Sequence, residues 1–295
     1  MANERVLSPN AHKIILGMQV NELTESIVYK KIADLVKDEH NKSVLIKIAD
    51  EEYRHYKIWK KYTKTETKPK KLKILWYTFL ARVLGFTFAL KLMERGEGNA
   101  SLTYKSISDE VPEAEKIALD EDQHEQQLLS LLDEERLQYV GSMVLGLSDA
   151  LVELSGTLAG LTFALQNTRL IALSGLITGI SATFSMASSE YLSHRSEGNS
   201  DALKSGIYTG VVYLLTVAFL VTPYLIFPNT HFMWALLTML ITVVLIIFAF
   251  TYYISVAKDV PFFKRFGEMT LISLGVSSFS FVIGIVVKKF LGIEI

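Results

Sequence analysis

The sequence contains no cysteine, which excludes disulfides, thiolate zinc sites, iron–sulfur clusters and a cysteine nucleophile. Any bound metal must therefore use carboxylate, imidazole or thioether ligands. The formal net charge of −1 excludes a strongly basic nucleic-acid-binding protein. The first residues show no basic segment followed by an apolar run, so we expect no cleavable signal peptide and a cytosolic N-terminal domain.

Charge is also scarce in the second part of the chain. Residues 1–136 contain 22 Lys and Arg and 23 Asp and Glu, whereas residues 137–295 contain only 8 of each sign. A soluble domain carries about 25% charged residues, so the second part belongs in lipid. The sequence predicts a soluble domain at 1–136 and a membrane domain at 137–295.

Five apolar stretches of the second part are long enough to cross about 30 Å of hydrocarbon. They lie near residues 137–165, 170–192, 205–227, 232–256 and 267–287. The positive-inside bias of the loops predicts a cytosolic N-terminus and an external C-terminus in the cytoplasmic membrane. Small faces that favour close helix contacts occur at Gly156/Gly160, Gly175/Gly179 and Gly206/Gly210.

Residues 72–93 form one more apolar stretch, interrupted by Lys73, Arg82 and Lys91. A sixth span here would place Arg82 near mid-bilayer, at a cost of roughly 2.5 to 3.5 kcal/mol. We therefore expect this stretch to begin a long helix of the soluble domain that lies on the membrane surface or in a dimer contact.

Four side chains in the first two spans are candidates for a cation path. Asp149 and Glu153 are spaced i, i+4, and so are Met186 and Glu190, which puts each pair on one helical face. Carboxylates in a bilayer need a cavity, another helix or a cation path to face, although Glu190 lies near enough to the span end to meet lipid headgroups instead. Met186 beside a carboxylate favours a softer cation than Mg²⁺ or Ca²⁺, whereas a lone Met most often serves packing.

Residues 137–295 resemble the vacuolar iron transporter family. The similarity rests on Gly-Leu-x-Asp-Ala-Leu-Val at 146–152, on Ser-Met-x-x-x-Glu-Tyr-Leu-Ser at 185–193 and on the count of five helices. The resemblance implies a dimeric, proton-driven exporter of ferrous or manganous ions, with Asp149 and Met186 lining the path.

Two features depart from that family. An acidic residue is common where this chain has Thr178, and the glutamate-rich cytosolic insert of the family is here only the loop 194–204. Cytosolic metal capture must therefore come from elsewhere in the chain.

Residues 1–136 fit four amphipathic helices. We expect the first to start at Pro9, the second to be capped by Asn41, the third to run over about 70–108, and the fourth to open at Pro112. No β-like alternation interrupts them, which predicts an all-α fold: a four-helix bundle followed by a five-helix membrane domain.

A repeat in the soluble part predicts a metal site. Lys-Ile-Ala-x-x-Glu-x-x-His occurs at 47–55 and again at 116–124, and a Glu with a Tyr seven residues later precedes each copy. Glu at i and His at i+3 project from one helical face, and two such helices plus a Glu from each remaining helix supply the ligands of a di-iron or di-manganese site. The predicted ligands are Glu22, Glu52, His55, Glu97, Glu121 and His124.

Neighbouring residues complete the expected site. Tyr29 and Tyr104 are predicted to hydrogen-bond the bridging carboxylates. Three further acids lie within a turn of ligands and are expected to be exposed charges, with a third metal position as the alternative: Glu25, Glu94 and Glu125. Two other imidazoles are expected at the surface: His12 and His40.

Residues 10–135 resemble rubrerythrins and other ferritin-like proteins through this repeat. The resemblance implies two iron or manganese ions per chain, but no cysteine is present to hold a rubredoxin-type iron. The fusion with a vacuolar-iron-transporter-like domain resembles the membrane-bound ferritins, which implies a bacterial or archaeal iron exporter and a homodimer.

Two functions from different classes remain open. The first is a proton-coupled exporter of cytosolic Fe²⁺ or Mn²⁺, in which the N-terminal domain captures or oxidises the metal. The second is a membrane-anchored di-iron ferroxidase or peroxidase, but a simple anchor would have no need of Asp149 and Glu153.

Overall fold

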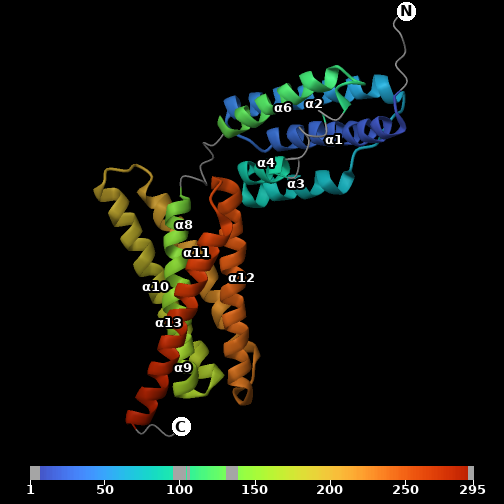
Figure 1. Cartoon of the computed structure of the whole chain (residues 1–295). Coiled ribbons are helices and arrows are strands. Elements are labelled where there is room, and N and C mark those ends of the chain that lie inside the picture. Colours follow the sequence, from blue (N-terminus) through green and yellow to red (C-terminus); the bar gives the residue numbers. More distant parts are fainter. Residues whose placement is uncertain (1–6, 96–103, 105–106, 131–138, 292–295) are drawn as a thin grey trace, which may run out of the picture. The chain divides into compact units, whose positions relative to one another are not determined.

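The computed structural model describes residues 7–95, 104, 107–130 and 139–291, and these residues form helices and no strand. The predicted all-α class is thereby confirmed. The chain divides into two compact units, Met1–Leu137 (unit 1) and Gln138–Ile295 (unit 2). Figure 1 shows that the helices of each unit lie side by side along much of their lengths.

Unit 1 consists of helices α1 (Pro9–Ala33), α2 (Glu39–Thr63), α3 (Lys71–Leu84), α4 (Phe86–Arg95) and α6 (Glu113–Ser130). α1 begins at Pro9 as predicted, and the Ser8 hydroxyl accepts a hydrogen bond from the Ala11 amide at 3.2 Å. The predicted cap of α2 was wrong: the side chain of Asp38 accepts from the Asn41 amide at 2.7 Å and caps the helix three residues earlier.

The predicted continuous helix over 70–108 was also wrong, because the chain breaks at Gly85. This residue has φ 102° and ψ 153°, a conformation that only glycine adopts without strain. α3 and α4 are therefore separate helices. This break lets α3 pack along α1 while α4 reaches α6.

The interior of unit 1 forms mainly between α1 and α2, which pack against each other along their lengths. Ile15 and Val28 of α1 and Leu45, Ile48 and Trp59 of α2 are fully buried. Each buried Leu or Ile contributes about 1.5 to 3 kcal/mol to folding. This apolar interior supports the polar side chains described below.

Unit 2 consists of helices α8 (Val140–Asp149), α9 (Ser155–Leu165), α10 (Thr168–Ser196), α11 (Ala202–Ile226), α12 (Phe232–Lys258) and α13 (Phe262–Leu291), with a π-helical turn η1 (Ala150–Leu154) and a 3₁₀ turn η2 (Asn229–His231). Because α8, η1 and α9 run on as one stretch, five helical stretches are long and apolar enough to cross a membrane. None of the five includes α3, so no sixth span occurs among the described residues.

Close helix approaches in unit 2 occur at the small residues that the sequence predicts. A Cβ added at Gly206 of α11 would lie only 2.7 Å from the Ala187 carbonyl oxygen of α10. A Cβ at Gly160 of α9 would lie 3.0 Å from the Ser280 carbonyl oxygen of α13. The backbones thus approach at distances that only glycine permits, which stabilises membrane helices through packing.

Candidate metal centre

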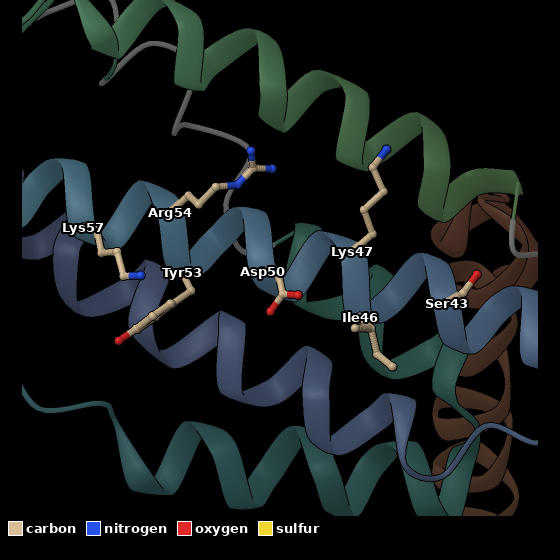
Figure 2. A pocket seen from close by; sticks show the side chains of 7 residues that line it. All are labelled: Ser43, Ile46, Lys47, Asp50, Tyr53, Arg54 and Lys57. Carbon is tan, nitrogen blue, oxygen red and sulfur yellow. The ribbon is translucent and has the colours of Figure 1, made fainter.

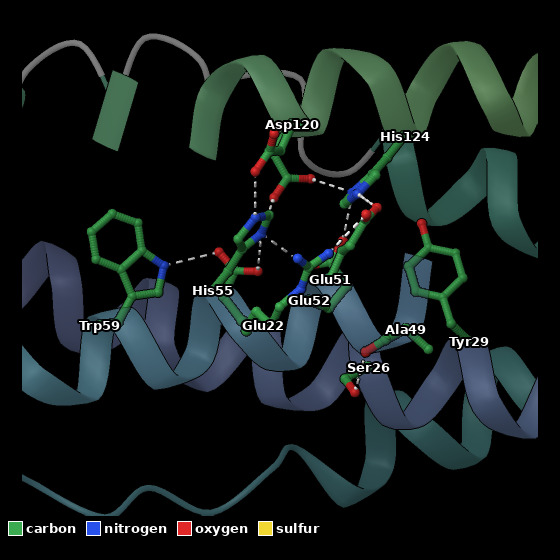
Figure 3. Close-up of polar contacts among 12 residues, drawn as sticks. Glu22, Ser26, Tyr29, Ala49, Glu51, Glu52, His55, Trp59, Asp120 and His124 are labelled. Carbon is green, nitrogen blue, oxygen red and sulfur yellow. Dashed lines mark hydrogen bonds and ion pairs between the residues drawn. The ribbon is translucent and has the colours of Figure 1, made fainter. Parts of the chain in front are cut away.

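Three helices of unit 1 bring carboxylate and imidazole side chains together. α1 contributes Glu22, α2 contributes Glu52 and His55, and α6 contributes Glu121 and His124. In α2 and in α6 the Glu and His are three residues apart, so they leave the helix on one face. Four of the five are buried, with exposed fractions of 1% for His124, 2% for Glu22 and Glu52, and 3% for His55. Figure 3 shows these four converging between the helices.

The distances within this cluster suit a cation. The Nδ1 atom of His55 lies 3.3 Å from a Glu121 oxygen and 3.6 Å from a Glu22 oxygen. One ligand atom from each of Glu22, Glu52, His55 and Glu121 lies within 4.8 Å of the others. The Nδ1 atom of His124 lies 3.0 Å from Glu52 and 3.6 Å from Glu121. Glu52 of α2 and Glu121 of α6 therefore each lie near both imidazoles. This buried cluster could bind metal.

Buried polar atoms without hydrogen bonds test whether these residues fit a metal. The Nδ1 atoms of His55 and His124 and one carboxylate oxygen each of Glu22 and Glu52 are buried without a hydrogen-bond partner. Leaving such a group unsatisfied costs about 1 to 3 kcal/mol, and more for a charged group. A divalent cation bound to these atoms would satisfy all four, so the donor set fits an N- and O-ligated metal.

The pKa values show how strongly these groups interact. Burial raises the pKa of Glu52 well above its usual value, and the charges of Glu121 and Glu22 raise it further. Burial opposes protonation of His55, but its contacts with Glu121 and Glu22 raise its pKa to about 10. Protons and a metal would therefore compete for the same atoms.

Two outer carboxylates, which the sequence analysis missed, hold the other nitrogen of each imidazole. The Nε2 atom of His55 on α2 lies 3.2 Å from Asp120 on α6, and the Nε2 atom of His124 on α6 lies 2.9 Å from Glu51 on α2. Each contact leaves Nδ1 directed at the ligand carboxylates. The signal was present in the repeat, because an acidic residue directly precedes the Glu in both copies.

Aromatic side chains hydrogen-bond the carboxylates from the side. Tyr104 was expected to hydrogen-bond a ligand carboxylate, and its hydroxyl donates to Glu22 at 3.2 Å. Trp59, which the sequence analysis did not name, donates its indole N–H to the same Glu22 oxygen at 3.0 Å. The Tyr29 hydroxyl donates to Glu94 at 2.5 Å. Tyr104 thus bonds a predicted ligand, whereas the carboxylate bonded by Tyr29 is not one of the predicted ligands.

The nearby acids differ from the expected exposed charges. Glu94 is partly buried, and burial raises its pKa to about 7. Glu25 is only 5% exposed and pairs with Lys73 at 2.9 Å. The expectation of a plain exposed charge was wrong for both, because Glu94 bonds Tyr29 of α1 and Glu25 pairs with Lys73 of α3. The predicted ligand Glu97 and the side chain of Glu125 lie outside the described residues. His12 and His40 are exposed, as expected.

A separate shallow hollow lies on α2, away from the cluster (Figure 2). It is lined by Ser43, Ile46, Lys47, Asp50, Tyr53, Arg54 and Lys57. Asp50 is paired with Lys30 of α1 at 3.0 Å. This hollow shares no residue with the metal cluster and has three basic lining residues, so it is a poor cation site.

In unit 2 the predicted carboxylates of the first span lie at an irregular turn. Asp149 is the last residue of α8, and Glu153 lies in the π-helical turn η1. The helical repeat changes at this point, because a π turn adds a residue to the turn, and the side chains of Asp149 and Glu153 still lie close enough to interact. Glu153 lines a narrow crevice with Thr178 of α10 and Tyr213 of α11, whose buried hydroxyl has no hydrogen-bond partner.

The second predicted pair lies on α10. Glu190 is 8% exposed, so it does not face lipid headgroups freely. It accepts a hydrogen bond from the Ser142 hydroxyl of α8 at 2.6 Å and lies 3.1 Å from the Nε2 atom of His194. Met186 is half-buried and packs on the apolar interior of unit 2. His194 was missed, although its i, i+4 spacing from Glu190 is visible in the sequence.

Comparison with known proteins bears on this part of the chain. Residues 140–201 match the VIT family. The match and the five apolar helices support a VIT-type membrane domain. The VIT family suggests a membrane metal ion transporter, and the matched residues include Asp149, Glu153, Met186 and Glu190. No match to the chain was found among curated proteins or among solved structures.

Proposed function

We propose that the chain is a proton-coupled exporter of Fe²⁺, with Mn²⁺ as a second substrate, and that unit 1 captures the cytosolic metal. The observation that carries the proposal is the pair Asp149 and Glu153, which interrupts an apolar span inside the region that matches the VIT family. Carboxylates are costly in a bilayer unless they serve a path.

The carboxylates of unit 2 perform the exchange in this proposal. Glu153 faces a crevice between α10 and α11, and a carboxylate that alternates between a proton and a cation couples their movements. Met186 and Glu190 lie one turn apart on α10 and receive the cation at the cytosolic end. The thioether favours Fe²⁺ or Mn²⁺ over harder cations.

Unit 1 supplies metal to that entrance. Its cluster supports a site for two ions per chain, because Glu52 and Glu121 each lie within 4.0 Å of both His55 and His124. Such a centre is that of ferritin-like di-iron proteins. The further elements of the proposal are a homodimer in the cytoplasmic membrane, a cytosolic N-terminus and an external C-terminus.

Transport through unit 2 is tested with Asp149→Asn in the full chain. The amide keeps the volume and hydrogen-bonding capacity but cannot ionise. In proteoliposomes with an internal pH reporter, we expect Fe²⁺ flux and the accompanying proton movement to be lost together, because a side chain that cannot ionise cannot exchange a proton for a cation.

The matched control is Asp201→Asn, which removes a carboxylate from a loop where it pairs with Lys204 at 3.3 Å. This variant should transport like the parent. Parental flux in Asp149→Asn, or metal flux without any pH change, would contradict a proton-coupled path through this residue.

A second candidate function is an enzyme in which unit 2 is mainly an anchor. The largely buried cluster of unit 1 favours it, because oxidation of Fe²⁺ needs no membrane path. This function predicts aerobic Fe²⁺ oxidation that depends on Glu52 and Glu121, together with no flux in any liposome experiment.

A further inference from the structure

The surface of α3 is unlike the rest of unit 1. Leu72, Leu75, Trp76 and Phe79 are 83%, 67%, 55% and 55% exposed. Their spacing of three and four residues places all four on one helical face. Trp76 and Phe79 also stack, with ring centroids 6.3 Å apart. We call these four residues the α3 stripe.

The opposite face of α3 packs on the unit itself. Ile74 and Ala81 are 7% and 6% exposed, and Lys73 pairs with the buried Glu25 of α1 at 2.9 Å. α3 is therefore held by unit 1 while the stripe points away from it. Contiguous exposed apolar surface of this kind marks an interaction site.

The charges around the stripe are of one sign. Residues 67–93 contain no Asp or Glu and include six bases: Lys68, Lys70, Lys71, Lys73, Arg82 and Lys91. Residues 1–136 as a whole carry 22 basic and 23 acidic residues, so positive charge is concentrated in this segment. Lys71 and Arg82 are exposed on α3.

The geometry points to the headgroup region of an anionic lipid bilayer as the partner of the α3 stripe. We propose that α3 lies flat on the membrane that unit 2 spans, with the stripe among the upper acyl chains and the exposed bases Lys71 and Arg82 at lipid phosphates. An apolar face of Leu, Trp and Phe beside Lys and Arg is the composition of interfacial helices.

Length and tethering favour this placement. α3 has 14 residues, which extend about 21 Å at 1.5 Å per residue and cannot cross about 30 Å of hydrocarbon. Only nine residues separate the end of α6 at Ser130 from the start of α8 at Val140, and they span at most about 30 Å. The bilayer is therefore always within reach of unit 1.

The absence of cysteine from the chain provides a direct test, since one introduced cysteine takes a label at one position. We would label Leu75→Cys and Phe79→Cys in the full chain with a fluorophore. The proteins would be placed in nanodiscs of 30% anionic lipid that contain acyl-chain nitroxide quenchers. Leu119→Cys on α6 is the matched control, because Leu119 is 58% exposed.

We expect quenching at positions 75 and 79 to exceed that at 119 at least threefold. Lys71→Gln with Arg82→Gln should weaken the affinity of α3 for anionic bilayers by up to about fivefold for each base removed, so quenching at 75 and 79 should fall toward that at 119. Lys47→Gln with Lys57→Gln, which removes two exposed bases from α2, should leave it unchanged.

Two results would overturn the proposal. Equal quenching at 75, 79 and 119 would mean that the stripe does not enter lipid. Nitroxide labels at 75 that report distances below about 20 Å between two chains, without lipid quenching, would assign the stripe to a second copy of the chain. Neither readout depends on transport, so the outcome is separate from the fate of the proposed exporter.

Discussion

The carboxylates of the two units have different surroundings. In unit 1 each buried acid meets a partner from another helix, such as Trp59 for Glu22 at 3.0 Å or His124 for Glu52 at 3.0 Å. In unit 2 Glu153 is exposed in a π-helical turn and lines a crevice, and Glu190 is buried beside the hydroxyl of Ser142 and the imidazole of His194. The first arrangement suits tight binding, whereas the second suits passage, because a transported ion must leave as readily as it enters.

The largest effect that distinguishes the two units is expected on removal of Glu52 and Glu121, the carboxylates that lie near both imidazoles. Glu52→Ala with Glu121→Ala should abolish metal binding by unit 1, since it removes the two carboxylates that lie within 4.0 Å of both imidazoles. Metal content of the purified full chain, measured after desalting, reports the loss. Asp50→Ala with Glu113→Ala, which removes two exposed acids from the same helices, should keep the parental content.

The Glu52→Ala, Glu121→Ala variant also tests whether unit 1 captures metal while unit 2 alone transports it. Flux at saturating Fe²⁺ should stay near the parental value, while the Fe²⁺ concentration for half-maximal flux should rise. Loss of flux at saturating Fe²⁺ would instead make unit 1 part of the conduit.

A smaller effect is expected from the outer carboxylates. Asp120→Asn and Glu51→Gln keep the side-chain size but weaken the hold on the Nε2 atoms of His55 and His124, at 3.2 and 2.9 Å. Each change should lower metal affinity by about 10- to 100-fold. Titration with Mn²⁺, with the free ion followed by EPR, measures this. Unchanged affinity in both variants would show that the rings are positioned by packing alone.

For each step of one pH unit, a still smaller effect is expected on unit 1. Contacts with Glu121 and Glu22 raise the pKa of His55 to about 10, so this side chain holds a proton at neutral pH that a metal must displace. Affinity for Mn²⁺ should therefore rise with pH, by up to about tenfold per unit for each proton displaced. The range from pH 6 to pH 8 is accessible to the same EPR titration. Affinity independent of pH would mean that His55 is not a ligand.

Much of the candidate metal site in unit 1 could be predicted from the sequence, because the Glu-x-x-His motif occurs twice. The two Glu-x-x-His copies identify Glu52, His55, Glu121 and His124 by a spacing that the α-helix imposes. The Glu51 and Asp120 contacts were not foreseen, because they depend on which helices face each other. The break at Gly85 was missed since a single glycine also fits within a helix.

The membrane-spanning helices of unit 2 could be predicted from the sequence, but the surroundings of its carboxylates could not. Length and composition suffice to find helices that can cross a bilayer, and the structure has five. The π-helical turn after Asp149 changes the hydrogen-bonding register of the backbone, which no periodicity of side chains signals. The burial of Glu190 likewise depends on Ser142 of a neighbouring helix.

The crossed pairing of the outer carboxylates has a consequence for how unit 1 holds together. Glu51 on α2 positions the ring on α6, and Asp120 on α6 positions the ring on α2. Neither helix can present its own imidazole correctly in the absence of the other. In the proposed function, metal loading and the docking of α6 on α2 would therefore be one cooperative event, and the concentration of free metal would set how firmly α6 is held on the rest of the unit.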